Sequence, residues 1–388
     1  MKKVNLNDLI EHIELNQERL LSFLPKKLRL YFEKIELNER GILIYGPRGV
    51  GKTTFLLSRM PEDFLYFSAD NPLISSVSLY ELGNKAFLKG YRGIIVDEVH
   101  FINKWSQHVK ALYDAFPNKS IWLSDSSSLI LRVGSFDLSR RFLKIHVPLL
   151  SFREFVHLKS DITFPIIDPF NYKKGEISDI VKKYNVLKFF NDYTSQGTRP
   201  IFLEGNFQEK MKNILEKTLY NDLPFFLPTI KDSYLRLMSA VIGLLVSSKV
   251  PTLNVESMCK NWGVGKEKFY QLLELLRATD VVNIIRKPHD KKVYSKGEKI
   301  FMYDPSFYHV YNGELGNFRE AYVAFALGEI EPVYTSPEER ECDFIWKGKK
   351  IEVGGKHKKA KSSDYILSDE LDFPVKNRVP LWMLGLMR

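Results

Sequence analysis

The chain has 388 residues, which allows two or three domains, each with its own hydrophobic core. Apolar residues make up 44% and charged residues 27%, as is typical of a soluble globular protein. The longest apolar stretch, residues 237–246, is too short to span a bilayer, and Asp8, Glu11 and Glu14 interrupt the apolar core that a signal peptide needs. We therefore expect a cytoplasmic protein with no membrane partner.

Positive charge is concentrated in two stretches of the chain. The formal net charge is +10, and lysines and arginines gather in residues 286–299 and 347–361. Such patches can contact phosphates, although lysine runs can equally be solvated faces. Charge therefore permits double-stranded DNA as a partner without requiring it.

The strongest motif follows an N-terminal segment, residues 1–40, that we expect to be helical. "GILIYGPRGVGKTTFLL" (41–57) places an apolar strand before a glycine-rich turn and an apolar helix after it. This is the P-loop pattern, in which backbone N–H groups and a helix N-terminus hold phosphates. Lys52 is expected to reach the β- and γ-phosphates, and the Thr53 hydroxyl to bind Mg²⁺. The predicted nucleotide contacts are Gly46, Pro47, Arg48, Gly49, Val50, Gly51, Lys52, Thr53 and Thr54.

A second motif, "GIIVDEVHF" (93–101), supplies two carboxylates. Its continuous apolar run predicts a buried parallel strand. Asp97, at the end of that strand, is expected to hold Mg²⁺. Glu98 follows directly and is the candidate general base that would polarise an attacking water. Hydrolysis, as opposed to nucleotide binding alone, rests on Glu98.

A third expected strand, within residues 120–131, ends in serines. Ser124 or Ser126 could contact the γ-phosphate, or Ser126 could cap the next helix, and the sequence leaves both open. Arg140 and Arg141 follow. An arginine placed on the transition-state charge can raise the rate about 10³-fold or more, yet both could equally be surface residues.

The order of these motifs, completed by "PLLSFREF" (148–155), resembles a family of prokaryotic AAA-superfamily P-loop ATPases. The resemblance implies an α/β fold with a RecA-like core, a helical lid, a winged helix and a small C-terminal α/β domain like restriction endonucleases of the PD-(D/E)xK type. It implies ATP as the nucleotide and Arg140 as the catalytic arginine of the family, with Ser139 replacing a glycine. It does not say whether Arg140 would act within its own subunit or across an interface.

The resemblance and the apolar pattern divide the chain into five expected segments. These are the helical segment 1–40, the ATPase core 41–155, the lid 156–232, the winged helix 233–312 and the nuclease-like domain 313–388. A DNA-binding winged helix would present Lys266, Lys268 and Gln271 to the groove, and Lys291 and Lys292 to phosphates. Alternatively, the winged helix is a packing module whose lysines stay in solvent.

The stretch "ECDFIWKGKKIEVGGK" (341–356) carries a candidate degenerate nuclease site. Glu320, Asp343 and Glu352 match the three acidic positions, which would bind Mg²⁺ to activate water. Gly354 stands where a lysine is expected, and Lys356 lies on the same face of the strand, two residues further along. A competent nuclease, a degenerate nucleic-acid-binding or scaffold domain and an unrelated hairpin all remain open. A helix near 362–371 and a strand at 379–387 are expected to complete the domain.

Three functions are therefore compatible with the sequence. The first is an ATPase that couples its nucleotide state to the winged-helix and nuclease-like modules. The second is an ATP-gated, metal-dependent nuclease. The third is a nucleotide switch that binds DNA or protein and does not hydrolyse ATP. The oligomeric state is left open.

Overall fold

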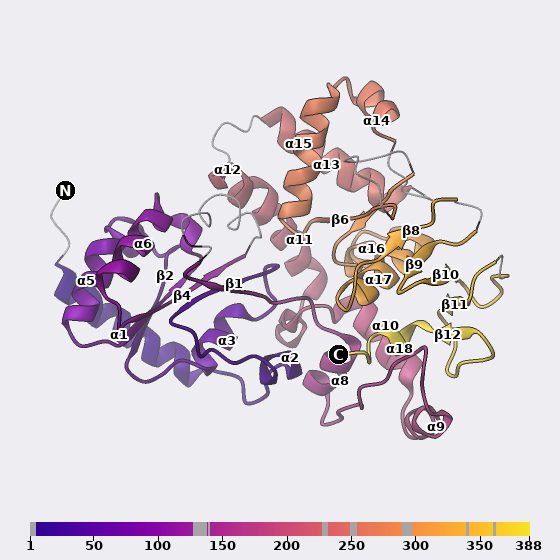
Figure 1. Ribbon diagram of the computed structural model, residues 1–388, viewed down its shortest axis with the longest axis horizontal. Helices are drawn as coiled ribbons and strands as arrows, with labels where there is room; N and C mark the ends of the chain where they lie inside the picture. The colour runs from indigo at the N-terminus through magenta and orange to yellow at the C-terminus, as the bar shows by residue number, and fades with distance from the viewer. Residues whose placement is uncertain are drawn as a thin grey trace. The chain divides into compact units, whose positions relative to one another are not determined.

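The computed structural model describes residues 5–126, 138, 140–226, 232–248, 254–288, 297–338, 341–359 and 362–388. Its contacts divide the chain into two compact units, residues 1–148 with 222–228, and residues 149–221 with 229–388 (Figure 1). The contacts thus separate the two units after Pro148, whereas the sequence placed the end of the ATPase core at residue 155. Within the described ranges, none of the helices is both long enough and apolar enough to cross a membrane.

The first unit contains a five-stranded parallel sheet with the strand order β2-β3-β4-β1-β5. The strands are β1 (Gly41–Tyr45), β2 (Phe64–Ser68), β3 (Gly93–Asp97), β4 (Ser120–Asp125) and β5 (Leu143–His146). The helices are α1 (Leu6–Ser22), α2 (Leu30–Glu33), α3 (Lys52–Ser58), α4 (Pro72–Ser75), α5 (Leu79–Leu88), η1 (Val99–Phe101), α6 (Trp105–Ala115) and α12 (Leu223–Phe226). The parallel α/β sheet predicted from the sequence is confirmed.

Helices cover both faces of this sheet, which explains the continuous apolar runs of its strands. In β3, Ile94 and Val96 pack in a cluster that also contains Leu82 of α5 and Val109 of α6. Ile95 points to the opposite face and is equally buried. Because all five strands are parallel, their carboxyl ends meet at one edge, and polar residues that follow them are brought together there.

The expected N-terminal helix is α1, which covers the outer strand β2. The side-chain amide of Gln17 accepts a hydrogen bond from the Tyr66 backbone N–H (2.7 Å) and donates one to the Phe64 carbonyl oxygen (3.2 Å). These two bonds occupy backbone groups that an edge strand would otherwise leave unpaired. The helix therefore closes this edge of the sheet.

The second unit contains two further sheets. A two-stranded antiparallel sheet pairs β6 (Val282–Ile285) with β7 (Lys299–Met302). A five-stranded sheet has the order β12-β11-β10-β9-β8, in which β10, β11 and β12 are parallel. Its strands are β8 (Tyr334–Thr335), β9 (Phe344–Trp346), β10 (Lys349–Gly354), β11 (Tyr365–Ser368) and β12 (Arg378–Pro380).

The described part of this unit also contains two groups of helices. The first group is α8 (Phe152–Lys159), α9 (Lys174–Lys183), α10 (Val186–Gln196), η2 (Pro200–Glu204) and α11 (Phe207–Lys217), followed by the π-helical turn Thr218–Asp222 that leads into the first unit. The second group is α13 (Asp232–Ser247), α14 (Val255–Trp262), α15 (Lys266–Ala278), α16 (Ser306–Val310), α17 (Leu315–Gly328) and α18 (Leu381–Leu384).

Two elements expected near the C-terminus are wrong. The helix near 362–371 is instead the strand β11, and the strand 379–387 is instead the short strand β12 followed by the helix α18. Leu381, Trp382, Met383 and Leu384 are all buried, and such a fully apolar run has no periodicity that separates a strand from a buried helix.

The segment predicted to be a winged helix has its elements in the expected order, with α14 and α15 followed by the β6–β7 hairpin. Lys266 pairs with Glu256 (2.7 Å), and the Lys268 ammonium lies 4.1 Å from the centre of the Tyr234 ring. Gln271 is exposed. Two of the three expected groove residues thus have protein partners, and the expected wing residues Lys291 and Lys292 lie outside the described residues. The winged helix stays a prediction.

Candidate functional site

The P-loop joins β1 to α3, and close packing explains its first glycine. Gly46 has φ of +146°, and a Cβ atom there would lie 2.2 Å from the Val147 carbonyl oxygen. The buried Arg29 guanidinium donates hydrogen bonds to the carbonyl oxygens of Val50 and Pro148, each at 2.8 Å. The loop is therefore fixed against the segment that follows β5.

Lys52, the first residue of α3, is almost fully buried within this loop. Its ammonium donates hydrogen bonds to the carbonyl oxygens of Gly46 (2.8 Å) and Pro47 (2.9 Å). Burial lowers the pKa of Lys52, and the carboxylates of Glu98 and Asp97 partly offset this effect. The charge lies where the sequence predicts bound phosphates.

Asp97 at the end of β3 accepts hydrogen bonds from three hydroxyl groups. Thr53 Oγ1 lies 2.5 Å from Asp97 Oδ2, Tyr66 donates to the same oxygen at 3.0 Å, and Ser124 donates to Oδ1. Hydroxyl and carboxylate oxygens are the ligands that Mg²⁺ prefers, so the donor set of Thr53 and Asp97 fits this ion. Tyr66 is an addition that no sequence motif indicated.

Glu98 follows β3 in a left-handed backbone conformation, with φ of 48° and ψ of 46°. A residue other than glycine rarely adopts this conformation, and such strain is concentrated at functional sites. Its carboxylate accepts hydrogen bonds from Arg48 Nη1 (3.0 Å) and from Ser126 Oγ (2.9 Å). The two serines considered as phosphate sensors thus contact the two acids, Ser124 on Asp97 and Ser126 on Glu98.

Arg48 joins Glu98 to a residue distant in the sequence. Its Nε and Nη2 atoms donate to the two carboxylate oxygens of Asp222, at 2.6 and 2.9 Å. This two-pronged pair is the strong geometry of an arginine with a carboxylate. Sequence reasoning placed Arg48 in the P-loop but gave no sign of Asp222, which is 174 residues away.

A histidine–aspartate pair lies next to Glu98. His100 Nδ1 is 2.7 Å from Asp125 Oδ2, and both side chains are buried. Burial lowers the pKa of His100, but the carboxylates of Asp125, Glu98 and Asp222 together outweigh burial, and the pKa is raised. Glu98, His100 and Asp125 offer one potential ligand atom each within 4.8 Å of one another. The sequence patterns did not indicate His100 or Asp125 as site residues, although Asp125 is the last residue of β4, just as Asp97 is the last residue of β3.

The contacts of Glu98 predict how its titration responds to substitution. Burial raises the pKa of Glu98, whereas Arg48 lowers it. A general base must be deprotonated, so activity falls when the pH drops below this pKa. We expect Arg48→Met to raise the pKa further and to move the acidic limb of the pH–kcat profile to higher pH. An acidic limb that stays in place or moves to lower pH would contradict this assignment. Arg59→Met, at the C-cap of α3 in the same unit, is the control.

Arg140, the predicted catalytic arginine, is exposed, and among the described residues no hydrogen bond joins it to Asp97 or Glu98. Arg141 pairs with Asp114 through bonds of 2.9 and 3.0 Å. Ser139 lies outside the described residues. The role of Arg140 stays a prediction.

The C-terminal acidic residues lie in the second unit. Lys299 of β7 contacts both Glu320 (2.6 Å) and Asp343 (3.1 Å). Glu352 is paired with Lys358 at 2.9 Å, whereas Lys356, the predicted replacement lysine, is exposed. The three expected carboxylates are therefore each bound to a lysine, and neither lysine was predicted.

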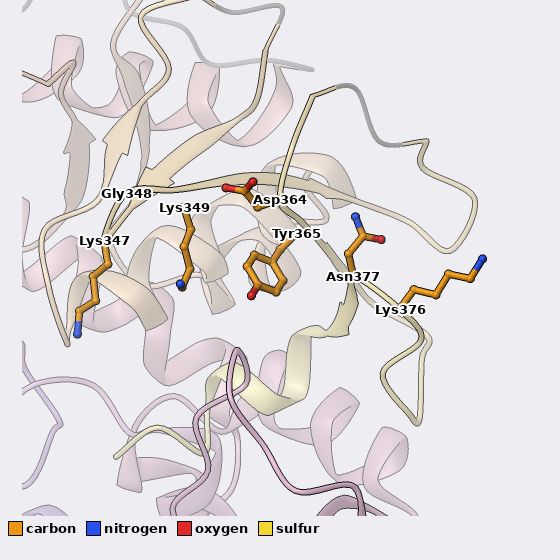
Figure 2. Close-up of a pocket in the computed structure, with 7 residues that line it drawn as sticks. All are labelled: Lys347, Gly348, Lys349, Asp364, Tyr365, Lys376 and Asn377. Atoms are coloured by element: carbon orange, nitrogen blue, oxygen red, sulfur yellow. The ribbon is translucent and has the colours of Figure 1, made fainter.

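The second unit also has a shallow pocket of about 600 Å³ at the amino ends of β10 and β11. Figure 2 shows its lining residues, namely Lys347, Gly348, Lys349, Asp364, Tyr365, Lys376 and Asn377. Three lysines against one carboxylate make the lining positive. The pocket shares no residue with the acidic cluster.

Part of the chain matches a known protein family. Residues 38–156 match the family model described as AAA domain. This segment contains the P-loop, Asp97, Glu98 and both serines, so the AAA-type P-loop domain expected from the sequence is confirmed for this part of the chain. The match covers less than half of the chain.

One curated relative is an uncharacterized protein of Methanocaldococcus jannaschii, 28% identical over 319 residues. The match covers 71% of this chain and 63% of the relative, so the chain spans less than two-thirds of that protein. Similar solved structures include the Thermotoga maritima RuvB Holliday junction branch migration motor, 16% identical, covering 78% of this chain and 95% of that one, with a TM-score of 0.33. AMPPCP-bound DnaA from Aquifex aeolicus is 16% identical, covering 71% and 91%, with a TM-score of 0.24. TM-scores this low assign no function.

Proposed function

We propose that this protein binds ATP with Mg²⁺ and hydrolyses it at the edge of the first unit's sheet. The observation that carries the proposal is the convergence of Lys52, Thr53, Asp97 and Glu98 within one compact unit. Lys52 would contact the phosphates, and Thr53 with Asp97 would hold Mg²⁺, which neutralises phosphate charge when bound.

Glu98 is the proposed general base. It would take a proton from the water whose oxygen bonds to the γ-phosphorus, while the bond from that phosphorus to the bridging oxygen of ADP breaks. Arg48 contributes by favouring the ionised form of Glu98. Ser126 orients the second carboxylate oxygen. These contacts favour hydrolysis over the alternative of a switch that binds ATP without turnover.

A second part of the proposal concerns DNA. Lys347, Lys349 and Lys376 line the pocket in Figure 2, the Lys349 ammonium lies 5.9 Å from the centre of the Tyr365 ring, and such cations attract phosphate backbones. We propose double-stranded DNA as the partner of this surface. DNA binding would then couple to the ATP site.

Phosphate release from ATP, measured with and without duplex DNA at low salt, tests both parts. We expect Mg²⁺-dependent release that DNA accelerates, and a loss of that acceleration in Lys349→Glu. Lys182→Glu on α9 is the control, because it changes charge equally at an exposed lysine outside the pocket.

The possible outcomes separate the two parts. Release that DNA leaves unchanged would contradict the DNA partner, whereas release that is absent with and without DNA would contradict ATP hydrolysis. Equal acceleration in the wild type and in Lys349→Glu would exclude the pocket as the DNA surface.

A further inference from the structure

Three carboxylates of the second unit lie near the Lys358 side chain, each from a different element. Glu320 lies on α17, Asp343 immediately precedes β9, and Glu352 lies on β10. Their side chains are 21%, 15% and 0% exposed. Carboxylates gathered away from solvent repel one another unless cations compensate their charge. A divalent metal ion is one such cation, and it is the one that the resemblance to nucleases implies.

In this structure, lysine side chains compensate the charge of these carboxylates. The Lys299 ammonium lies between two of the carboxylates, 2.6 Å from Glu320 Oε2 and 3.1 Å from Asp343 Oδ1. Its side chain is only 12% exposed, and its ammonium also lies 4.7 Å from the centre of the Phe344 ring. Lys299 reaches the cluster from β7, which belongs to the two-stranded sheet and not to the sheet that carries Glu352.

A second lysine, Lys358, explains why residue 354 is a glycine. A Cβ atom on this glycine would lie 2.7–2.8 Å from the Cβ, Cγ and Cδ atoms of Lys358. Any larger residue would therefore displace the aliphatic part of that side chain, whose ammonium lies 2.9 Å from Glu352 Oε1. Gly354 thus gives space to a lysine that comes from the following loop.

Both oxygens of Asp343 are engaged by protein groups. Asp343 Oδ2 accepts a hydrogen bond from the Val353 backbone N–H at 2.8 Å, while its Oδ1 faces Lys299. Two ammonium groups against three carboxylates leave about one negative charge. A divalent ion would have to displace Lys299 to reach both Glu320 and Asp343, so the residues present do not fit the metal that the nuclease resemblance implies.

We propose that the Lys299 ammonium takes the place of a divalent cation between Glu320 and Asp343, so that this nuclease-like cluster is held together without metal. The cluster then fastens the β6–β7 hairpin to α17 and to the segment before β9. Metal-dependent cleavage is not expected from this cluster in the wild-type chain.

Mn²⁺ binding to the nucleotide-free 388-residue chain tests whether the Lys299 ammonium stands where a metal ion would bind. We expect the wild type and Glu320→Gln to bind the same number of Mn²⁺ ions by electron paramagnetic resonance titration. Lys299→Met frees the two carboxylates and is expected to bind one more Mn²⁺ per chain. Adding Glu320→Gln to Lys299→Met should abolish that extra ion, and Lys299→Arg, which keeps the cation, should not gain it.

Thermal unfolding gives a second readout. Mn²⁺ is expected to raise the Tm of Lys299→Met by more than it raises the Tm of the wild type or of Lys299→Arg, because an additional ion that binds only the folded state stabilises it further. A wild type that loses one bound Mn²⁺ through Glu320→Gln would overturn the proposal. That comparison needs no Lys299 variant, so it decides the matter even where Lys299→Met does not fold. A folded Lys299→Met that gains no ion would overturn it as well.

Discussion

Glu98→Gln is expected to lower kcat for ATP hydrolysis by about 10²- to 10⁴-fold, the usual contribution of a general base. The substitution keeps the size of the side chain, and an amide can still accept the hydrogen bond that Ser126 donates. It removes the group that would accept the proton from water. ATP affinity should therefore change little, because Lys52 and Thr53 are untouched.

Equilibrium binding of a fluorescent ATP analogue and steady-state phosphate release, measured on one preparation, check this result. Glu18→Gln on α1 is the matched control, since Glu18 is exposed and lies in the same unit. Wild-type and Glu98→Gln chains that bind ATP equally and turn over at the same negligible rate would favour the non-hydrolysing switch. Equal and substantial turnover in both would place the base elsewhere.

Asp304→Asn is expected to lower the free energy of unfolding of the second unit by about 3–5 kcal/mol, because it leaves a buried arginine without its counter-ion. Arg199 Nε lies 2.8 Å from Asp304 Oδ2, and the two side chains are 3% and 0% exposed. Asp304 also accepts hydrogen bonds from the Thr198 hydroxyl (3.1 Å) and the Ser306 hydroxyl (2.7 Å). One substitution therefore disturbs a whole buried network.

Urea unfolding followed by tryptophan fluorescence measures this effect. Glu204→Gln is the control, because it breaks the solvent-exposed pair with Lys210, for which a loss below about 1 kcal/mol is expected. Similar unfolding midpoints for the two variants would contradict a stabilising role for the Arg199–Asp304 pair. Loss of folded Asp304→Asn protein, with Glu204→Gln folded normally, would agree with it.

Local sequence patterns predicted the part of the candidate site that lies close together in the chain. The glycine spacing before Lys52 and the apolar run before Asp97 each specify a strand end, and parallel strands bring such ends to one edge. The same logic could have found Asp125, since it closes β4. It could not have found Asp222, because no local pattern records a contact across 174 residues.

The C-terminal region shows a different limit of sequence reasoning. The sequence predicted a site made of Glu320, Asp343 and Glu352. It also has a glycine, Gly354, where such sites carry a lysine. It could not show that Lys358 folds back across that glycine, because this depends on the path of a loop. Nor could it connect Lys299 with Glu320, because they lie on elements that meet only in the folded unit. The lysine that compensates for Gly354 comes from the loop and not from the strand that carries Lys356.

Single-turnover phosphate release, with the chain in excess over ATP, tests hydrolysis at the P-loop site most directly. We expect a Mg²⁺-dependent release in the wild type that disappears in EDTA and in Lys52→Ala prepared in the same way. Single-turnover conditions separate chemistry from product release, so slow loss of ADP cannot hide the result. A wild-type chain that binds Mg²⁺ and ATP, yet releases phosphate no faster than Lys52→Ala, would contradict the proposed ATPase.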